Sequence, residues 1–270
     1  MIWLVQLVFG CADPDAIPRF WGRALEYRHD LAYASEDEVA AFRAAYPQFE
    51  GRGRIDDREL RRPPVYVQRV PEPKRSRNRL RLELGVAVGQ KGPVVEELIA
   101  LGARPGDTPG ELQDVEGNEF SVVEDPATAE RRLRSVVFDC LDSERMLEFW
   151  SAATGFHASE GRCDPGDIGL AHDGGVFSVS GRRFLHITGM EATPTRPVLF
   201  DLSPGLAFVT TERPKDRKNR IHLDLNSTDA ETDRERLTAL GATVLRWDTD
   251  HVLADPEGNE FCLSPSRSPD

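Results

Sequence analysis

Short apolar runs alternate with polar turns along this chain, and the same order of runs occurs in both halves. Leu4 to Cys11 and Leu133 to Leu141 are rich in β-branched and apolar residues, which predicts a strand that opens each half. An aspartate follows at the turn, Asp13 or Asp142, where its carboxylate can cap a helix that carries a Phe-Trp pair. Each half is therefore predicted to begin with a strand, a turn and a helix.

The pattern continues in both halves with a strand, a Lys-rich connection, another strand and a second helix. The first of these strands is predicted over 64–70 and 206–211, and the second helix over 93–101 and 229–240. Gly-Ala follows each of these helices, as is typical of a C-terminal stop. A D-x-E-G-N turn then leads into the final strand. The pattern thus predicts two β-α-β-β-β units in each half.

The two halves share their motifs at fixed offsets. Lys74 to Leu84 (K-R-S-R-N-R-L-R-L-E-L) returns as Lys215 to Leu225 (K-D-R-K-N-R-I-H-L-D-L), an offset of 141 residues (215 − 74). The D-x-E-G-N-E-F segment at 114–120 returns at 255–261 with the same offset. Upstream, the strand residue Val8 returns as Val137, an offset of 129 residues (137 − 8). The chain therefore contains two tandem copies of one domain, which we predict at residues 1–128 and 129–270.

The halves differ most between the first helix and the Lys-rich connection. Residues 28–63 contain a capping box, S-E-D-E, followed by Val39, Phe42 and Tyr46 at helical spacing. A helix there could cover a site as a lid, or it could only cover an exposed sheet edge. The second half instead has strand-like pieces at 176–179 and 184–187.

Taken in order, C-x-D followed by F-W, K-x-x-x-N-R-x-x-L-[DE]-L, L-G-A and D-x-E-G-N-E-F resemble the glyoxalase-like domains of the vicinal oxygen chelate superfamily. This glyoxalase, bleomycin resistance and dioxygenase superfamily implies an α+β fold, in which paired β-α-β-β-β units curve a mixed sheet into a cup. Its members include metal-dependent isomerases, dioxygenases and thiol transferases as well as metal-free proteins that sequester antibiotics. The resemblance therefore indicates the fold more sharply than the function.

The resemblance also implies four ligand positions per domain, on the first strand, the strand that closes the first unit, the strand that opens the second, and the last strand. They fall on Gln6, Gln68, Arg81 and Ser121 in the first domain, and on Ser135, Val209, His222 and Cys262 in the second. Because side chains alternate along a strand, Glu83, Asp224 and Glu260 share the faces of these positions.

Neither domain alone offers three good metal ligands. Many relatives build each site across two domains, which here would gather Gln6, Gln68, His222 and Cys262 in one cup. Imidazole and thiolate suit a soft divalent ion, but two amides without a carboxylate bind hard cations poorly. The sequence thus favours a site without a native metal or other cofactor, and a divalent metal at these four residues is the alternative.

Three functional classes remain open. The first is a binding protein or metal-independent enzyme that takes a small aromatic or natural-product ligand, held by Gln6, Gln68, Arg81, Ser121, Ser135, Cys262 and Glu260. The second is a metal-dependent lyase or isomerase of glyoxalase type. The third is a scaffold with vestigial cups. Catalysis in either enzyme would depend on His222, Asp224 and Glu83 as the proton-transferring groups.

Composition narrows the partners. The chain has 270 residues with 46 acidic and 34 basic ones, a net charge of −12, and its cations are scattered or paired. This argues against nucleic acid and anionic membranes as partners.

The first nine residues are too short for a membrane span and lack a basic leader. Cys11 and Cys140 fall inside predicted strands, so we expect reduced thiols and a cytoplasmic protein. A small-molecule ligand and a monomer or homodimer are the expected partners. Hydrolase, zincin, redox and nucleotide signatures are absent from the sequence.

Overall fold

The computed structural model describes residues 2–27, 52–56, 62–126, 128–155, 157–159, 177–179, 182–188, 205–248 and 251–265. The first half comprises β1 (Ile2–Cys11), α1 (Ala16–Ala24), β2 (Arg52–Ile55), β3 (Val65–Arg69), β4 (Leu80–Val86), α3 (Lys91–Ala100), β5 (Arg104–Pro105), β6 (Glu111–Gln113) and β7 (Glu119–Glu124). The second half comprises β8 (Arg132–Cys140), α4 (Ser143–Thr154), β9 (His157–Ser159), β10 (Phe177–Val179), β11 (Arg182–Thr188), β12 (Gly205–Thr210), β13 (Ile221–Ser227), α5 (Ala230–Ala239), β14 (Thr243–Arg246), β15 (Val252–Ala254) and β16 (Glu260–Pro265). The helix predicted from the capping box in 28–63 lies outside the described residues.

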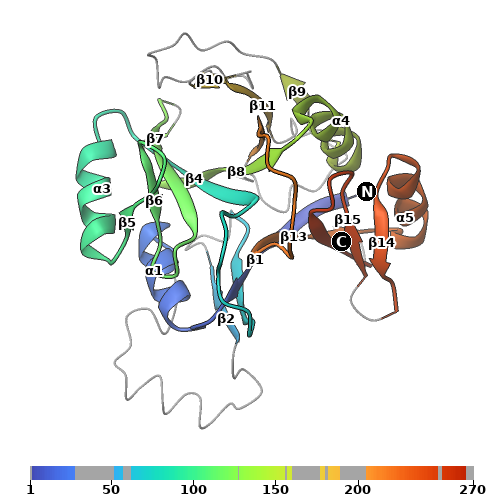
Figure 1. The fold of residues 1–270 in the computed structure, drawn as a ribbon, viewed down its shortest axis with the longest axis horizontal. Helices are drawn as coiled ribbons and strands as arrows, with labels where there is room; N and C mark the ends of the chain where they lie inside the picture. Colours follow the sequence, from blue (N-terminus) through green and yellow to red (C-terminus); the bar gives the residue numbers. More distant parts are fainter. Residues whose placement is uncertain are drawn as a thin grey trace.

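Two mixed sheets carry the fold, and each takes one unit from each half of the chain. The seven-stranded sheet has the order β14-β15-β16-β13-β1-β3-β2, and the nine-stranded sheet has the order β10-β11-β12-β8-β4-β7-β6-β5 with β9 paired to β11. The joins are antiparallel, β1 with β13 and β8 with β4, and Figure 1 shows β1 beside β13 near the centre of the molecule. We call the concave face of the seven-stranded sheet cup 1 and that of the nine-stranded sheet cup 2. The α+β fold with two curved sheets is confirmed, and the units pair across the halves.

The helices cover the faces of the sheets that lie opposite the cups, as the alternation of apolar and polar residues along the strands predicts. Leu7, Phe9 and Cys11 on β1 are fully buried on the helix side. Figure 1 places α1 and α3 on one side of the molecule and α4 and α5 on the other. Trp21 of α1 packs against Phe120 of β7, with ring centroids 5.1 Å apart. Because β7 belongs to the other sheet, this helix and its core tie the two sheets together.

The Phe-Trp pair and the D-x-E-G-N turn, distant in sequence, meet in this core. Trp21 Nε1 donates to Asp114 Oδ2 at 2.9 Å, and both residues are fully buried. Asn118 donates its backbone N–H and its side-chain amide to the same carboxylate, while Gly117 supplies a positive φ of 83° for the turn. A buried carboxylate needs several donors to remain charged, which explains why both motifs recur in each half.

The aspartate predicted to cap the first helix of each half is confirmed as the N-cap in the second half, whereas in the first half the N-cap lies two residues later. Asp142 is the N-cap of α4 and accepts from the backbone N–H of Arg145 at 3.0 Å. In the first half the N-cap of α1 is Asp15, and Asp13 accepts from the backbone N–H groups of Asp15 and Ala16. Among the described residues, no helix is long and apolar enough to cross a membrane.

Candidate functional site

Four polar side chains from three strands of the seven-stranded sheet meet in cup 1. Gln6 lies on β1, His222 and Asp224 on β13, and Cys262 on β16, and the strand register places Asp224 between Gln6 and Cys262. Gln6 Nε2 donates to Asp224 Oδ2 at 2.8 Å, and His222 Nε2 lies 3.4 Å from Asp224 Oδ1. The ligand atoms of His222, Asp224 and Cys262 all lie within 4.8 Å of one another. Cup 1 thus presents an imidazole, a carboxylate, a thiol and an amide side by side.

Asp224 is the centre of this cluster. Its side chain is 23% exposed, and that of His222 is 13% exposed. Burial alone would raise the pKa of Asp224, but the nearby His222, the hydrogen bond from Gln6 and the contact with Cys262 hold this pKa below its ordinary value of 3.8. Asp224 is therefore a carboxylate at neutral pH. It can accept hydrogen bonds, but it is a weak base.

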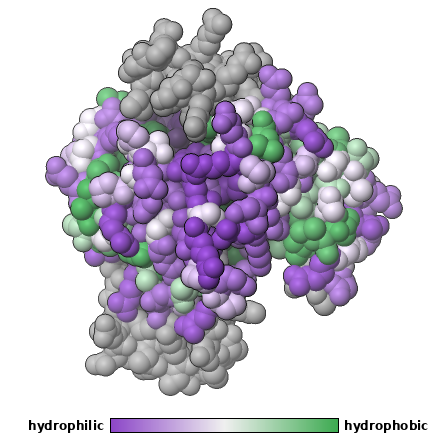
Figure 2. Space-filling model, in the orientation of Figure 1, coloured by the Kyte–Doolittle hydropathy of each residue, from purple (hydrophilic) through white to green (hydrophobic). Residues whose placement is uncertain are grey.

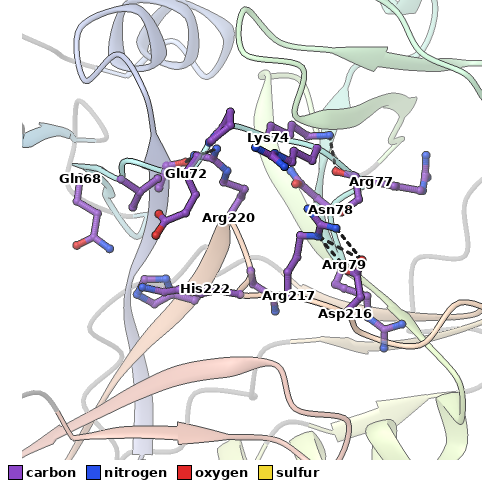
Figure 3. A pocket seen from close by; sticks show the side chains of 17 residues that line it. Gln68, Glu72, Lys74, Arg77, Asn78, Arg79, Asp216, Arg217, Arg220 and His222 are labelled. Carbon is purple, nitrogen blue, oxygen red and sulfur yellow. Dashed lines mark hydrogen bonds and ion pairs between the residues drawn. The ribbon is translucent and has the colours of Figure 1, made fainter.

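Gln68 lies apart from this cluster. It is opposite Gly10 in the β1–β3 register, four residues along β1 from Gln6 and therefore about 13 Å away along the strand. It does line a cavity together with His222 (Figure 3). Of the four residues expected to meet in this cup, the structure brings Gln6, His222 and Cys262 together, and Asp224 takes the place next to them.

Glu260, the other acid expected to face this cup, is held by the Lys-rich connection. Lys215 Nζ donates to Glu260 Oε1 at 2.8 Å, and the backbone N–H of Asn219 donates to Glu260 Oε2 at 3.2 Å. The first half repeats the arrangement, since Lys74 Nζ donates to Glu119 Oε1 at 2.8 Å. The repeated K-x-x-x-N motif therefore anchors each connection to the last strand of its half.

Cup 2 holds a closed network of ion pairs. Arg77 Nη1 and Nη2 donate to the two carboxylate oxygens of Glu111 at 2.6 Å each, and Arg77 Nε donates to Asp139 at 3.1 Å. Arg81 Nη2 donates to Asp139 at 2.7 Å and Arg81 Nη1 to Glu111 at 3.3 Å. Arg81 therefore pairs with Asp139 of the adjacent strand β8 and with Glu111 of β6, which lies beyond β7 in the same sheet.

Glu83 has its own partners. It accepts from the guanidinium of Arg134 and, at 2.9 Å, from Ser135 Oγ. Ser121 lies beside it, since the β4–β7 register pairs the two residues. Val209, at the remaining expected position, is 3% exposed and packs in an apolar cluster. Glu83, Ser121, Ser135 and Val209 therefore surround the ion network, and the acids of this face are bound to arginines.

The offsets make the two cups comparable position by position, and the comparison explains their difference. Arg81 corresponds to His222, and Arg77 corresponds to Lys218 (218 − 77 = 141). The two acids that hold the arginines in cup 2, Glu111 and Asp139, correspond to Val252 (252 − 111 = 141) and Gly10 (139 − 10 = 129) in cup 1. Cup 1 therefore has no acid at either of these two positions, and a network like that of cup 2 cannot form from them.

Cup 1 also has the donor set for a divalent metal. Two ligands that bind a tetrahedral zinc ion at about 2.0–2.1 Å lie about 3.3–3.4 Å apart. His222 Nε2 and Asp224 Oδ1 are 3.4 Å apart. Cys262, a partly exposed free thiol, would be the third ligand, and Gln6 a weak fourth. These residues fit such an ion, whereas the arginine-bound acids described in cup 2 do not.

Two cups of paired β-α-β-β-β units define a tandem protein of the glyoxalase-like class. The profile of the glyoxalase-like domain family matches residues 6–123 and again residues 135–264. The chain therefore belongs to this family and contains two copies of its domain, as the sequence motifs predicted.

Solved structures of the same superfamily resemble this fold. Glyoxalase I from Zea mays is 13% identical, with 97% of this chain and 92% of that chain covered and a TM-score of 0.64. Its V278E mutant is 15% identical with the same coverage and a TM-score of 0.59. A putative dioxygenase from Bacillus subtilis is 12% identical, with 99% and 85% covered and a TM-score of 0.54. At these identities the likeness shows the fold alone. No curated protein matches the chain significantly.

Several residues of the two sites escaped the reasoning from sequence. Glu111 and Asp139 were not considered, and Arg77 was seen only as part of a repeated motif. The signal was present in the offsets, because Gly10 and Val252 stand where the other half has acids. Such a difference becomes informative only after the structure shows that the four positions share one face.

Proposed function

We propose that this protein binds a small organic molecule in cup 1 and acts on it by proton transfer without a metal. The observation that supports this is the cluster of Gln6, His222, Asp224 and Cys262. Among the described residues, Asp224 forms no ion pair with a lysine or arginine, whereas the acids of cup 2 do. Val8 is buried and Tyr66 half-buried on the same face, which suits an aromatic or natural-product-like ligand.

In this proposal His222 carries the proton. Asp224 has a lowered pKa and is a weak base on its own, but its carboxylate can accept a hydrogen bond from the Nε2–H of His222 and so orient the ring. The other ring nitrogen, Nδ1, then accepts a proton from the ligand, since imidazole is the side chain best matched to proton transfer at neutral pH. Gln6 fixes the far oxygen of Asp224 and would help hold it in place.

A divalent-metal-dependent lyase or isomerase is the second candidate. The 3.4 Å separation between His222 and Asp224 favours it, because this is the spacing of two ligands on one ion. His222, Asp224 and Cys262 would hold the ion, which would polarise vicinal oxygens of a bound ligand. A vestigial scaffold with filled cups is less well supported, because a cavity of about 350 Å³ reaches His222.

A ligand screen in two buffers separates these candidates. A library of small aromatic and carbonyl compounds is screened by thermal shift, once with a chelator and once after loading with zinc, nickel, manganese or iron. Binding that persists in chelator supports the first proposal, and binding that requires the metal supports the second. Plasma mass spectrometry on the loaded protein gives the metal content directly.

The repeat supplies matched controls for the same screen. His222→Ala and Cys262→Ala alter cup 1, while Ser121→Ala makes the corresponding change to Cys262→Ala in cup 2. We expect ligand or metal binding to be lost in the cup 1 variants and retained in Ser121→Ala. Equal effects of Cys262→Ala and Ser121→Ala on binding would contradict the assignment of the site to cup 1.

A further inference from the structure

A cavity of about 350 Å³ lies between the two Lys-rich connections, where cup 1 opens. Residues 72–79 and 216–220 form most of its wall, and Gln68 and His222 lie at one end (Figure 3). The two segments are repeat equivalents, so the cavity lies between corresponding parts of the two halves. In Figure 2, hydrophilic residues gather over the centre of the face where these connections run in Figure 1.

The wall of this cavity is strongly cationic. It contains seven basic side chains and two acidic ones: Lys74, Arg75, Arg77, Arg79, Arg217, Lys218 and Arg220 against Glu72 and Asp216. Four of the cations have carboxylate partners at 2.5 to 2.9 Å, namely Lys74, Arg77, Arg79 and Arg217. Within the described part of the chain, the other three have no carboxylate partner. Local excess charge of this kind is notable in a protein with a net charge of −12.

The excess follows from the divergence of the two halves. Lys218 corresponds to Arg77, whose acidic partners are replaced by Val252 and Gly10 around cup 1. Gly10 has no side chain, and Val70 packs closely against it, because a Cβ there would lie only 3.1 Å from the side chain of Val70. The lack of acids at these two positions therefore accounts for a cation at Lys218 without the partners that Arg77 has.

Arg220 is held in place without being neutralised. Its guanidinium donates to the backbone carbonyls of Gly10, at 3.1 Å, and of Glu72. Its counterpart Arg79 instead forms an ion pair with Glu257 at 2.5 Å. A guanidinium fixed by carbonyl groups keeps its full charge and its remaining donors for a ligand, and its planar fork suits phosphate and carboxylate groups.

We infer that this cavity binds a small organic molecule that carries at least two phosphate or carboxylate groups. Arg75, Lys218 and Arg220 supply the positive charge that such a ligand requires. The cavity volume falls within the range of small-molecule sites. The inference extends the proposed function by naming the chemical class of the ligand, whose remaining part would point toward His222.

Isothermal titration with inorganic pyrophosphate and, separately, with citrate tests this inference at constant ionic strength, because salt screens exposed charges. The test variant is the double substitution Arg75→Gln and Lys218→Gln, which removes two cations that have no carboxylate partner. The control is Lys91→Gln with Arg104→Gln, two cations outside the cavity wall. We expect the test variant to bind about tenfold more weakly or worse, and the control to bind like the wild type. The stronger of the two probes identifies the acidic group.

A second variant tests the origin of the charge. Val252→Glu restores an acid at the position that Glu111 occupies in cup 2, and we expect it to weaken anion binding by neutralising Lys218. Failure of both probes to bind at millimolar concentration, or equal weakening in the control, would overturn the inference. His222→Ala should leave pyrophosphate binding within about twofold, because His222 lies at one end of the cavity and is not one of the three cations assigned to the anion. Loss of anion binding and loss of cup 1 activity are thus distinguishable.

Discussion

Removal of one carboxylate from cup 2 should strongly destabilise the protein. The side chain of Glu111 is 5% exposed and accepts two hydrogen bonds from Arg77 at 2.6 Å and one from Arg81. Burial alone would lower the pKa of Arg77, and the bonds and charges of Glu111 and Asp139 reverse this and raise it. In Glu111→Gln two arginines would share one carboxylate, and the new amide N–H would face guanidinium donors.

The expected cost is about 3–5 kcal/mol of unfolding free energy, the size found when one partner of a buried ion pair is removed. Glu97→Gln is the matched control, because Glu97 pairs with Arg131 at the same 2.6 Å but is 45% exposed. Arg131 is 8% exposed, but Glu97 lies in water, and we expect its removal to cost about 0–1 kcal/mol, the size found for a surface pair. Urea unfolding followed by tryptophan fluorescence measures both variants. If Glu111→Gln costs no more than Glu97→Gln, the cup 2 network does not have the structural role assigned to it.

Three further predictions follow from the buried groups. Trp21→Phe should lower the free energy of unfolding by about 2–3 kcal/mol, because it removes a hydrogen bond to the buried carboxylate of Asp114. Trp150→Phe should lower it less, because the hydrogen bond from Trp150 to Asp255 is 3.3 Å long rather than 2.9 Å. Urea unfolding measures both variants. The wild type should be more stable than Asp224→Asn, because the folded protein stabilises the Asp224 carboxylate. This difference in unfolding free energy should be complete above the ordinary pKa of 3.8 and should vanish as the pH falls through the lowered pKa of Asp224. Unfolding of both proteins at a series of pH values measures it. A maleimide should label Cys262 before Cys140, because burial raises the pKa of the Cys140 thiol. Mass spectrometry of the digested protein gives the order of labelling, and faster labelling of Cys140 would contradict the prediction.

The sequence was sufficient for the fold and for the faces of the strands. The fixed offsets predicted two copies of one domain, and alternation along β13 placed His222 and Asp224 on one face and Leu223 and Leu225 on the other. The structure confirms that alternation, with Leu223 and Leu225 buried against the core. These features are local, because strand parity and repeat length are properties of the chain itself.

Contacts between units could not be read from the chain in the same way. The sequence left open how the four units pair, and the partners of Asp224 depend on that choice, since Gln6 reaches it only across the β1–β13 join. The network around Arg81 likewise depends on the join of β4 with β8, which brings in Asp139. Both are consequences of register between strands more than 50 residues apart, which local pattern does not determine.

A single cup would have to provide both a stabilising ion-pair network and a ligand site, whereas two cups can divide these roles. A buried network that lost an acid would leave a cation unpaired in the core, at a cost of several kcal/mol. In cup 2, Glu111 and Asp139 neutralise Arg77 and Arg81. Cup 1 has Val252 and Gly10 at the corresponding positions, and the shared core around Trp21 holds the two sheets together without a second network at these positions. Without acids at these two positions, cup 1 has a polar cluster around Asp224 and a cationic cavity wall, which are the features of a ligand site.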